Sequence, residues 1–194
     1  EVNINNFLKY QYTKNKIFTF LYNGRLIKDK GIIEYIEAAH IVKKKYKKIK
    51  FIIMGSYDEN NPNSVKKTYL KKNISYGNIE YIGFKDDPFS IVETVDCVVL
   101  PSYREGLSRS LLECMALCKP IITSRVPGCK ELVINNLNGF LCEPKSSKDL
   151  AEKMIKIINL NHNEIQAMGY KGLEIIKEKY TTDIVLEKFL KLIK

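Results

Sequence analysis

The chain of 194 residues has no tryptophan, only two histidines and no long apolar run. A membrane-spanning helix needs about 18 or more consecutive apolar residues, and no charged start followed by an apolar run marks a signal peptide. We therefore expect a cytoplasmic protein, either soluble or peripheral to a membrane. His40 and His162 are predicted within a helix and at a helix start, so neither is a candidate general base.

The sequence also lacks a clear pattern of metal ligands. The five cysteines lack the short paired spacings to histidine that zinc sites use. Cys114 and Cys118 lie one helical turn apart and could share a metal, but their positions, like that of Cys97, are typical of small buried residues. We expect reduced structural thiols. Asp86 and Asp87 are interpreted as caps of a helix start rather than as Mg²⁺ ligands.

Acidic residues are outnumbered: 32 Lys and Arg oppose 22 Asp and Glu, a formal net charge of +10. Part of the excess lies in the run 43–48, KKKYKK. An anionic membrane surface would attract it, at on the order of 1 kcal/mol per basic residue. The run is also typical of the solvated C-terminal end of a helix, where cations are favoured. Nucleic-acid binding is not expected, because no stacking aromatics or recognition motif accompany the charge.

Short apolar segments alternate with helical patterns along the chain. Six segments are predicted strands: 17–22, 50–54, 79–82, 96–102, 120–123 and 139–142. Helices are expected over 32–47, 65–72, 88–94, 107–118, 147–159, 163–179 and 182–194, with Ser147 and Thr182 as N-caps of the fifth and seventh. This alternation predicts an α/β fold, a Rossmann-like doubly wound parallel sheet with helices on both faces and a helical C-terminal tail.

The predicted domain organisation is simple. Residues 1–15 are polar and aperiodic, typical of a linker from a preceding domain. Residues 16–180 form one domain, within the usual range of about 100 to 200 residues, and 181–194 a C-terminal helix. Because the chain begins with Glu1 rather than Met, we expect it to be a piece of a longer protein.

The loop after the first predicted strand carries residues suited to a diphosphate. Ligands of parallel sheets bind outside the C-terminal ends of the strands. Arg25 and Lys30 flank this loop, and Gly24 and Gly31 permit close approach of the backbone. Arginine supplies a planar fork of donors and lysine a point charge, which together match a diphosphate. On spacing alone the two could also be ordinary surface cations.

The segment 104–113, REGLSRSLLE, places Glu105 and Glu113 eight positions apart across a strand-to-helix turn. The N–H groups at such a helix start favour an anion, and carboxylates beside it accept hydrogen bonds from hydroxyl groups. Nucleotide-sugars need both features. On helical geometry alone, Glu113 could equally be a solvated residue within reach of Arg109 at i,i+4.

Together these segments resemble the retaining glycosyltransferases with two Rossmann-like domains (the GT-B fold, group 1 or family 4 type), which include bacterial capsule and lipid-linked-glycan transferases. The resemblance runs from about Phe18 to the C-terminus. It rests on several blocks in the family's order: 23–26 NGRL, 30–31 KG, 83–87 GFKDD, the Glu pair, 120–123 PIIT, 126–128 VPG and 138–141 NGFL.

The resemblance implies that this chain is the C-terminal, donor-binding domain, with an acceptor domain preceding it. It implies catalytic roles for Arg25 and Lys30 on the donor diphosphate and for Glu105 on the donor sugar, and it places Glu113 on the ribose. It implies no metal or other cofactor, because cations and helix ends neutralise the leaving UDP. The other expected donor contacts are Gly24, Gly55, Phe84, Lys85, Gly106, Leu107 and Ser108, with 83–85 receiving the nucleobase.

The implied function is transfer of a sugar from a UDP-sugar to a glycan or lipid-linked acceptor in surface polysaccharide biosynthesis. The fragment alone is expected to be inactive. Two alternatives stay open. One is the GT-B module of an epimerase or a phosphorylase, although no acid/base pair near the sugar and no pyridoxal lysine is evident. The other is a nucleotide-binding module without catalysis.

Overall fold

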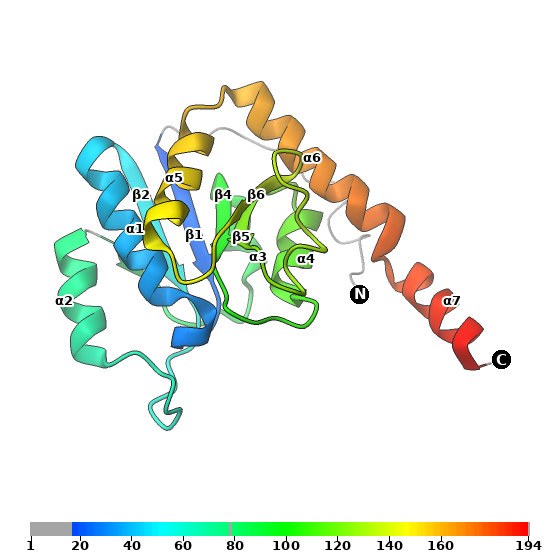
Figure 1. Ribbon diagram of the computed structural model, residues 1–194, viewed down its shortest axis with the longest axis horizontal. Helices are drawn as coiled ribbons and strands as arrows, with labels where there is room; N and C mark the ends of the chain where they lie inside the picture. Colours follow the sequence, from blue (N-terminus) through cyan, green and yellow to red (C-terminus); the bar gives the residue numbers. More distant parts are fainter. Residues whose placement is uncertain (1–16, 78, 194) are drawn as a thin grey trace.

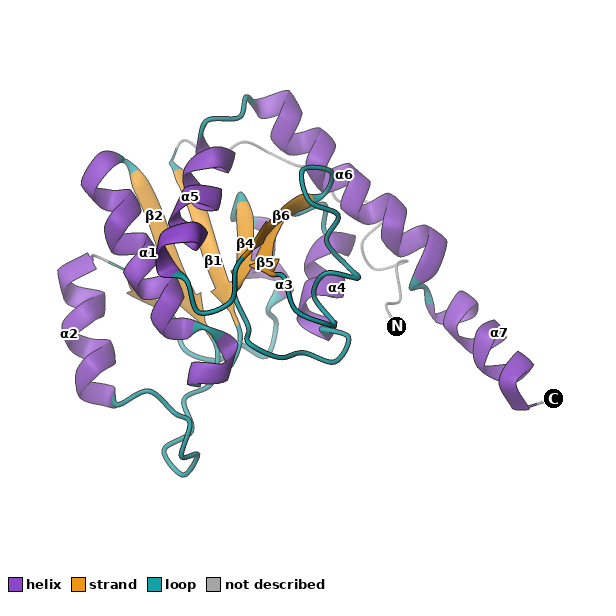
Figure 2. Cartoon of the chain, in the orientation of Figure 1, coloured by secondary structure: helices purple, strands orange, loops and turns teal. Residues whose placement is uncertain are grey.

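Six parallel strands form one sheet with helices on both faces (Figures 1 and 2). The computed structural model describes residues 17–77 and 79–193, so the predicted linker 1–15 lies outside the described residues. The strands are β1 (Phe18–Asn23), β2 (Ile49–Met54), β3 (Glu80–Tyr81), β4 (Cys97–Leu100), β5 (Ile121–Ser124) and β6 (Gly139–Cys142). The predicted Rossmann-like fold is confirmed.

The strand order is β3-β2-β1-β4-β5-β6. From β1 the chain adds β2 and β3 toward one edge of the sheet, and it then adds β4, β5 and β6 toward the other, so the order of addition reverses between β1 and β4. On one side of this reversal β1 pairs with β2, with Phe18 opposite Ile49. On the other it pairs with β4, with Phe20 opposite Cys97. Such a reversal is the switch point of a doubly wound sheet, where the loops diverge to opposite faces and leave room for a ligand.

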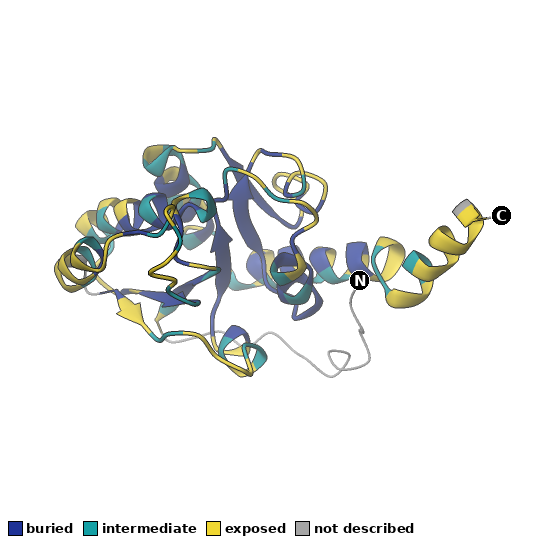
Figure 3. Ribbon diagram, turned by 90° about the horizontal axis from the view of Figure 1, so that it is seen from below, coloured by how far each residue is buried: buried dark blue, intermediate teal, exposed yellow. Residues whose placement is uncertain are grey.

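The helices are distributed between the two faces, α1 beside α2 and α5 on one, α4 beside α6 on the other. The last helix, α7, extends from α6 away from the sheet, and most of its surface is exposed (Figure 3). No helix among the described residues is long and apolar enough to span a membrane. The helices are α1 (Ile32–Lys45), α2 (Lys67–Gly77), α3 (Phe89–Glu93), α4 (Arg109–Ala116), α5 (Ser147–Ile158), α6 (His162–Lys179) and α7 (Thr182–Ile193), with a short 3₁₀ helix at Lys28–Lys30.

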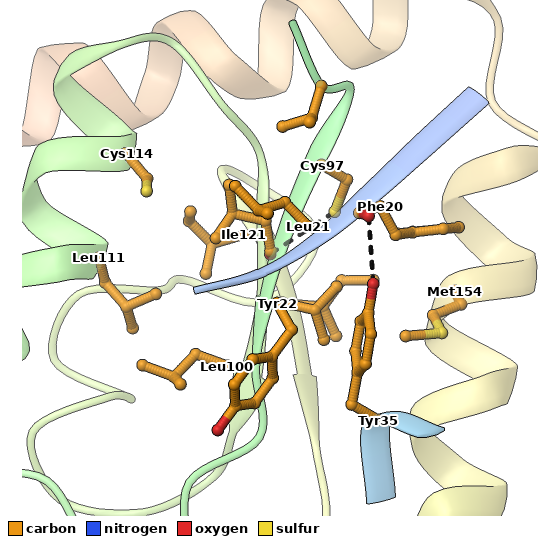
Figure 4. Close-up of a cluster of buried hydrophobic side chains, with 14 of the residues drawn as sticks. Phe20, Leu21, Tyr22, Tyr35, Cys97, Leu100, Leu111, Cys114, Ile121 and Met154 are labelled. Carbon is orange, nitrogen blue, oxygen red and sulfur yellow. Dashed lines mark hydrogen bonds between the residues drawn. The ribbon is translucent and has the colours of Figure 1, made fainter. Parts of the chain in front are cut away.

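Aromatic side chains of β1 and α1 lie in the core among aliphatic and sulfur-containing side chains (Figure 4). The rings of Phe20 and Phe51 stack with centroids 5.4 Å apart. The buried Tyr35 hydroxyl shares its proton between the carbonyl oxygens of Phe20 (3.1 Å) and Ile52 (3.0 Å), which ties α1 to two strands. Burial of a polar tip is tolerated because it is hydrogen-bonded.

The five cysteines are buried free thiols, as expected of small core residues. Burial raises the pKa of Cys114 and of Cys142 to about 12. A thiol with so high a pKa stays protonated near neutral pH and is a poor nucleophile. These cysteines therefore serve packing.

Several elements differ from their predicted bounds. The helix expected over 65–72 runs from Lys67 to Gly77, and the strand expected over 96–102 is limited to Cys97–Leu100. The third strand, expected over 79–82, is limited to Glu80–Tyr81, and both residues are exposed. An edge strand pairs on one side only, and just beyond this one the Ile82 N–H still donates to the Ile53 carbonyl oxygen at 3.0 Å. The cap interpretation of the nearby acidic pair is confirmed for Asp87, whose carboxylate accepts a hydrogen bond from the Phe89 N–H at 3.0 Å.

Two predicted N-caps are wrong by one residue. Ser146, not Ser147, precedes α5 in an extended conformation and accepts a hydrogen bond from the Asp149 N–H at 3.2 Å. Thr181, not Thr182, caps α7 through its hydroxyl. In each pair of adjacent hydroxyl residues the first is outside the helix, and only that one can reach the N–H three residues on.

Two buried glycines of α6 offer a matched test of this packing. A Cβ atom at Gly169 would lie 1.9 Å from the Cys118 carbonyl oxygen, whereas one at Gly172 would lie 3.6 Å from Met115. Gly172→Ala should raise the free energy of unfolding by about 0.5 to 1 kcal/mol, the usual helical preference. Gly169→Ala should lower it by about 1 to 3 kcal/mol because backbone must shift. Urea denaturation measures both, and equal effects would contradict the described contact of α6 with 118.

Candidate functional site

The loops after β1, β2 and β3 are joined by backbone hydrogen bonds at one edge of the sheet. The Gly24 N–H donates to the Met54 carbonyl (3.1 Å), and the Gly55 N–H donates to the Gly83 carbonyl (3.0 Å). Three of the predicted contact segments therefore meet at the carboxyl ends of the strands, as the parallel sheet requires.

Two glycines with positive φ let the remaining loops pack against each other. Gly31, at φ 71°, stands where a Cβ atom would come within 2.1 Å of the Pro101 carbonyl oxygen. Gly128, at φ 82°, stands where a Cβ atom would come within 1.5 Å of the Gly106 carbonyl oxygen. Both positions require glycine for conformation and for space. They bring the β1 loop to the end of β4, and the segment 126–128 to the loop that carries Glu105.

A largely buried ion pair joins the two loops of the switch point. Lys30 Nζ lies 2.5 Å from Glu105 Oε1, and the two side chains are 20% and 8% exposed. The hydroxyl of Ser102 donates to the same oxygen at 2.8 Å. Removing one partner of such a pair would leave the other charge uncompensated. Two residues predicted as separate donor contacts are thus in direct contact with each other.

Tyr103, in the loop after β4, contacts both α1 and the loop after β1. Its hydroxyl donates to Glu34 Oε1 on α1 at 2.5 Å, and its N–H donates to the Asp29 carbonyl at 2.8 Å. Burial, and after it the Glu34 carboxylate, raises the pKa of Tyr103. The second Glu34 oxygen is buried and has no hydrogen-bond partner among the described residues. The segment between Ser102 and Glu105 is therefore held to the first loop and to α1.

Arg25 has a fixed backbone and an exposed side chain. The buried Tyr22 hydroxyl donates to the Arg25 carbonyl at 2.8 Å. Burial raises the pKa of Tyr22, and the Glu105 carboxylate adds to this effect. The Arg25 guanidinium forms no ion pair with a described residue. The backbone of Arg25 is thus held in place, while its guanidinium group is accessible to solvent.

Helix α4 begins at this edge and carries the second glutamate. Arg109 Nε lies 2.9 Å from Glu113 Oε1, which confirms the expected i,i+4 contact. Ser108 is the N-cap by position, but its hydroxyl lies near Ser110 Oγ (3.3 Å) and makes no side-chain capping bond. The first turn of α4 thus keeps N–H groups without a side-chain cap.

Other predicted contact residues lie on the same loops without joining this network. Phe84 is 68% exposed, and Lys85 and Leu107 are exposed as well. Sequence reasoning missed Ser102, Tyr103 and Glu34. Their positions gave one usable signal only: Ser102 and Tyr103 directly follow a predicted strand and precede the first glutamate.

The strand order and the switch point define a Rossmann-like α/β class of domain. The chain belongs to the family of glycosyl transferases group 1, whose family model matches residues 6–174. The expectation drawn from the resemblance is confirmed at the level of the family.

Relatives of this chain include named bacterial glycosyltransferases. It is 33% identical over 187 residues to the capsular polysaccharide biosynthesis glycosyltransferase CapM of Staphylococcus aureus, covering 95% of this chain and 48% of CapM. It is 31% identical over 169 residues to the N,N'-diacetylbacillosaminyl-diphospho-undecaprenol alpha-1,3-N-acetylgalactosaminyltransferase of Campylobacter jejuni, covering 87% and 42%. The chain thus spans about half the length of these relatives.

Solved structures with the same fold include one of matching extent. The C-terminal domain of the glycosyl transferase group 1 family protein LpcC from Francisella tularensis is 27% identical with a TM-score of 0.79, covering 94% of this chain and 100% of that one. A point mutant of TarM of S. aureus, solved in complex with Fondaparinux, alpha-GlcNAc-glycerol and UDP, is 30% identical with a TM-score of 0.78, covering 96% and 38%. The C-terminal GT-B fold is therefore confirmed.

Proposed function

We propose that this chain is the donor-binding domain of a retaining glycosyltransferase that moves a sugar from a UDP-sugar to a glycan or lipid-linked acceptor in surface polysaccharide biosynthesis. Family membership and relatives named for capsule and lipid-linked glycan synthesis support the proposal, as does a structural relative solved with UDP. The observation that carries it is the Lys30–Glu105 ion pair, which joins the two switch-point loops, one of which also carries the exposed Arg25.

The proposed diphosphate contacts are Arg25 and Lys30. Both are at the carboxyl end of β1, and the first turn of α4 adds the N–H groups near Gly106, Leu107 and Ser108. Breaking the bond to the sugar leaves negative charge on the departing diphosphate. Cations and N–H groups already positioned at this edge would stabilise that charge, and such stabilisation is usually the largest single contribution to catalysis. We propose that they do so without a metal or another cofactor.

The two glutamates have different proposed targets. Glu105 is held by Lys30 and Ser102 and would accept hydrogen bonds from the donor sugar. Glu113 lies about one turn into α4 and would accept hydrogen bonds from the ribose. Its contact with the exposed Arg109 is an i,i+4 pair of about 0.3 to 0.5 kcal/mol, weak enough for a ribose hydroxyl to compete. The loop with Phe84 and Lys85, beside Gly55 and Gly24, would receive the nucleobase.

The acceptor half of the active site is proposed to lie in a preceding domain of the same protein. The chain spans about half the length of its relatives. A second domain facing the strand-end loops would exclude water and place the acceptor hydroxyl within about 3 to 3.5 Å of the anomeric carbon, a positioning worth several kcal/mol of barrier. By this proposal, residues 1–194 bind the donor but transfer no sugar.

Binding of UDP to this chain tests the diphosphate contacts. Arg25→Ala and Lys30→Ala should each weaken UDP binding by about 1.5 to 3 kcal/mol, because each removes a charge-assisted hydrogen bond. Isothermal titration calorimetry measures the affinities, and chelator should leave them unchanged. Lys28→Ala, which removes an exposed cation from the same loop, is the matched control. If Arg25→Ala and Lys30→Ala both bind UDP like the Lys28 variant, the diphosphate assignment is wrong.

A peripheral membrane contact is proposed at the opposite end of the domain. Helix α1 starts at the donor edge and ends in the lysine run, so the run lies at the other edge of the sheet. Lys43 and Lys47 line two adjoining grooves there, of about 650 and 150 Å³. Lys44, Lys47 and Lys48 pair with no carboxylate among the described residues. The exposed ring of Tyr76 lies beside them, a combination suited to an anionic, cytoplasmic membrane face.

Vesicle sedimentation tests this contact. With each basic residue contributing on the order of 1 kcal/mol, Lys44→Glu/Lys47→Glu/Lys48→Glu should weaken binding to phosphatidylglycerol vesicles at least tenfold. Phosphatidylcholine vesicles should bind neither protein. A control of equal net charge reverses three exposed lysines elsewhere: Lys130, Lys148 and Lys177. Equal losses in the two triple variants would mean that net charge, not this surface, attracts the lipid.

A further inference from the structure

One oxygen of Glu105 receives both hydrogen bonds that the carboxylate makes with described residues. Lys30 Nζ lies 2.5 Å from Oε1, and Ser102 Oγ lies 2.8 Å from the same atom. Ser102 is fully buried, directly beyond the end of β4, so its hydroxyl has little freedom to turn elsewhere. The contact spans three residues within a loop that Tyr103 also fixes through its N–H to the Asp29 carbonyl.

The other oxygen, Oε2, is left for a ligand. It forms no hydrogen bond with a described residue, yet it is absent from the buried polar atoms that lack a partner. The Glu105 side chain is 8% exposed, so the small exposed part includes Oε2. The carboxylate is therefore oriented, with Oε1 toward the protein and Oε2 toward the solvent at the carboxyl end of the sheet.

Lys30 and Ser102, which both donate a hydrogen bond to Glu105 Oε1, differ in whether a bound nucleotide would compete for them. In the proposed function, Lys30 also contacts the diphosphate of the UDP-sugar. The bound ligand would therefore compete with Glu105 for the Lys30 ammonium group. Ser102 is buried and has no such second target. Of the two, only the Ser102 bond is independent of nucleotide binding.

We propose that Ser102 is a positioning residue for donor-sugar recognition. Resting on the proposed function, this inference adds a residue that acts through Glu105. The Ser102 hydroxyl fixes Oε1, and the fixed carboxylate presents Oε2 as the acceptor for a hydroxyl group of the donor sugar. A carboxylate held in one orientation loses less freedom when it accepts that bond, which favours the sugar but leaves UDP itself unaffected.

Calorimetry on this chain separates the sugar from the nucleotide. The probes are UDP, UDP-glucose, UDP-galactose and UDP-N-acetylglucosamine, and the measured quantity is the ratio of the affinity for the best-bound UDP-sugar to that for UDP. Ser102→Ala should lower this ratio about three- to tenfold and leave UDP affinity within twofold. Glu105→Ala should remove the preference for the sugar. The double variant should be no worse than Glu105→Ala, because Ser102 acts only through that carboxylate.

The matched control is Thr123→Val. Thr123 is also fully buried, and its hydroxyl donates to the Leu100 carbonyl at 2.7 Å, next to the same loop but without contact to Glu105. Its loss should change thermal stability about as much as Ser102→Ala and leave the sugar ratio unchanged. Ser102→Thr, which keeps the hydroxyl, should restore most of the ratio.

Three results would overturn the inference: additive effects of Ser102→Ala and Glu105→Ala, an equal loss of UDP and UDP-sugar affinity in Ser102→Ala, or a wild-type chain that binds UDP but prefers no UDP-sugar. In each of these cases UDP still binds and the donor-domain proposal stands. Failure of the wild-type chain to bind UDP at all would instead contradict the proposed function.

Discussion

The ion pair between Lys30 and Glu105 is the contact on which the site depends. It connects the loop after β1 to the loop after β4, the two loops that diverge at the switch point of the sheet. Because both side chains are largely shielded from water, losing either would leave a poorly solvated charge. The pair therefore does two things at once. It closes the structure between the two halves of the sheet, and it holds a cation and a carboxylate side by side at the place where a nucleotide-sugar would bring a diphosphate and a sugar.

The surrounding structure supports that pair with contacts that need no charge. Gly31 lets the loop after β1 lie against the end of β4, and Gly128 lets the segment 126–128 lie against the loop that carries Glu105. Tyr103 adds two hydrogen bonds to the same cross-link. Rigid support of this kind keeps reacting groups within the small tolerances that catalysis needs. The lysine-rich end of α1 lies at the other edge of the sheet, so lipid contact there would leave the donor edge accessible.

Much of this arrangement could be predicted from the sequence, because parallel sheets place strand-end loops together. The order of the strand segments and the glycine turns was enough to bring Arg25, Lys30 and Glu105 to one edge. The direct Lys30–Glu105 contact could not be predicted, since side-chain geometry across 75 positions leaves no periodic signal. Ser102 lies only three residues from Glu105, but its place after a strand does not show which side chain its hydroxyl contacts. The edge strand β3 and the caps at Ser146 and Thr181 differ from prediction because partial pairing and a choice between adjacent hydroxyl residues are decided by tertiary packing.

The central claim is that the two switch-point loops form one donor site. Backbone amide NMR of the isotopically labelled chain during titration with UDP tests it most directly. The account predicts that amide shifts change in 24–31, 83–85 and 105–113, three segments far apart in sequence, while 43–50 at the opposite edge stays unchanged. Changes confined to 43–50, or to only one of the two switch-point loops, would contradict it.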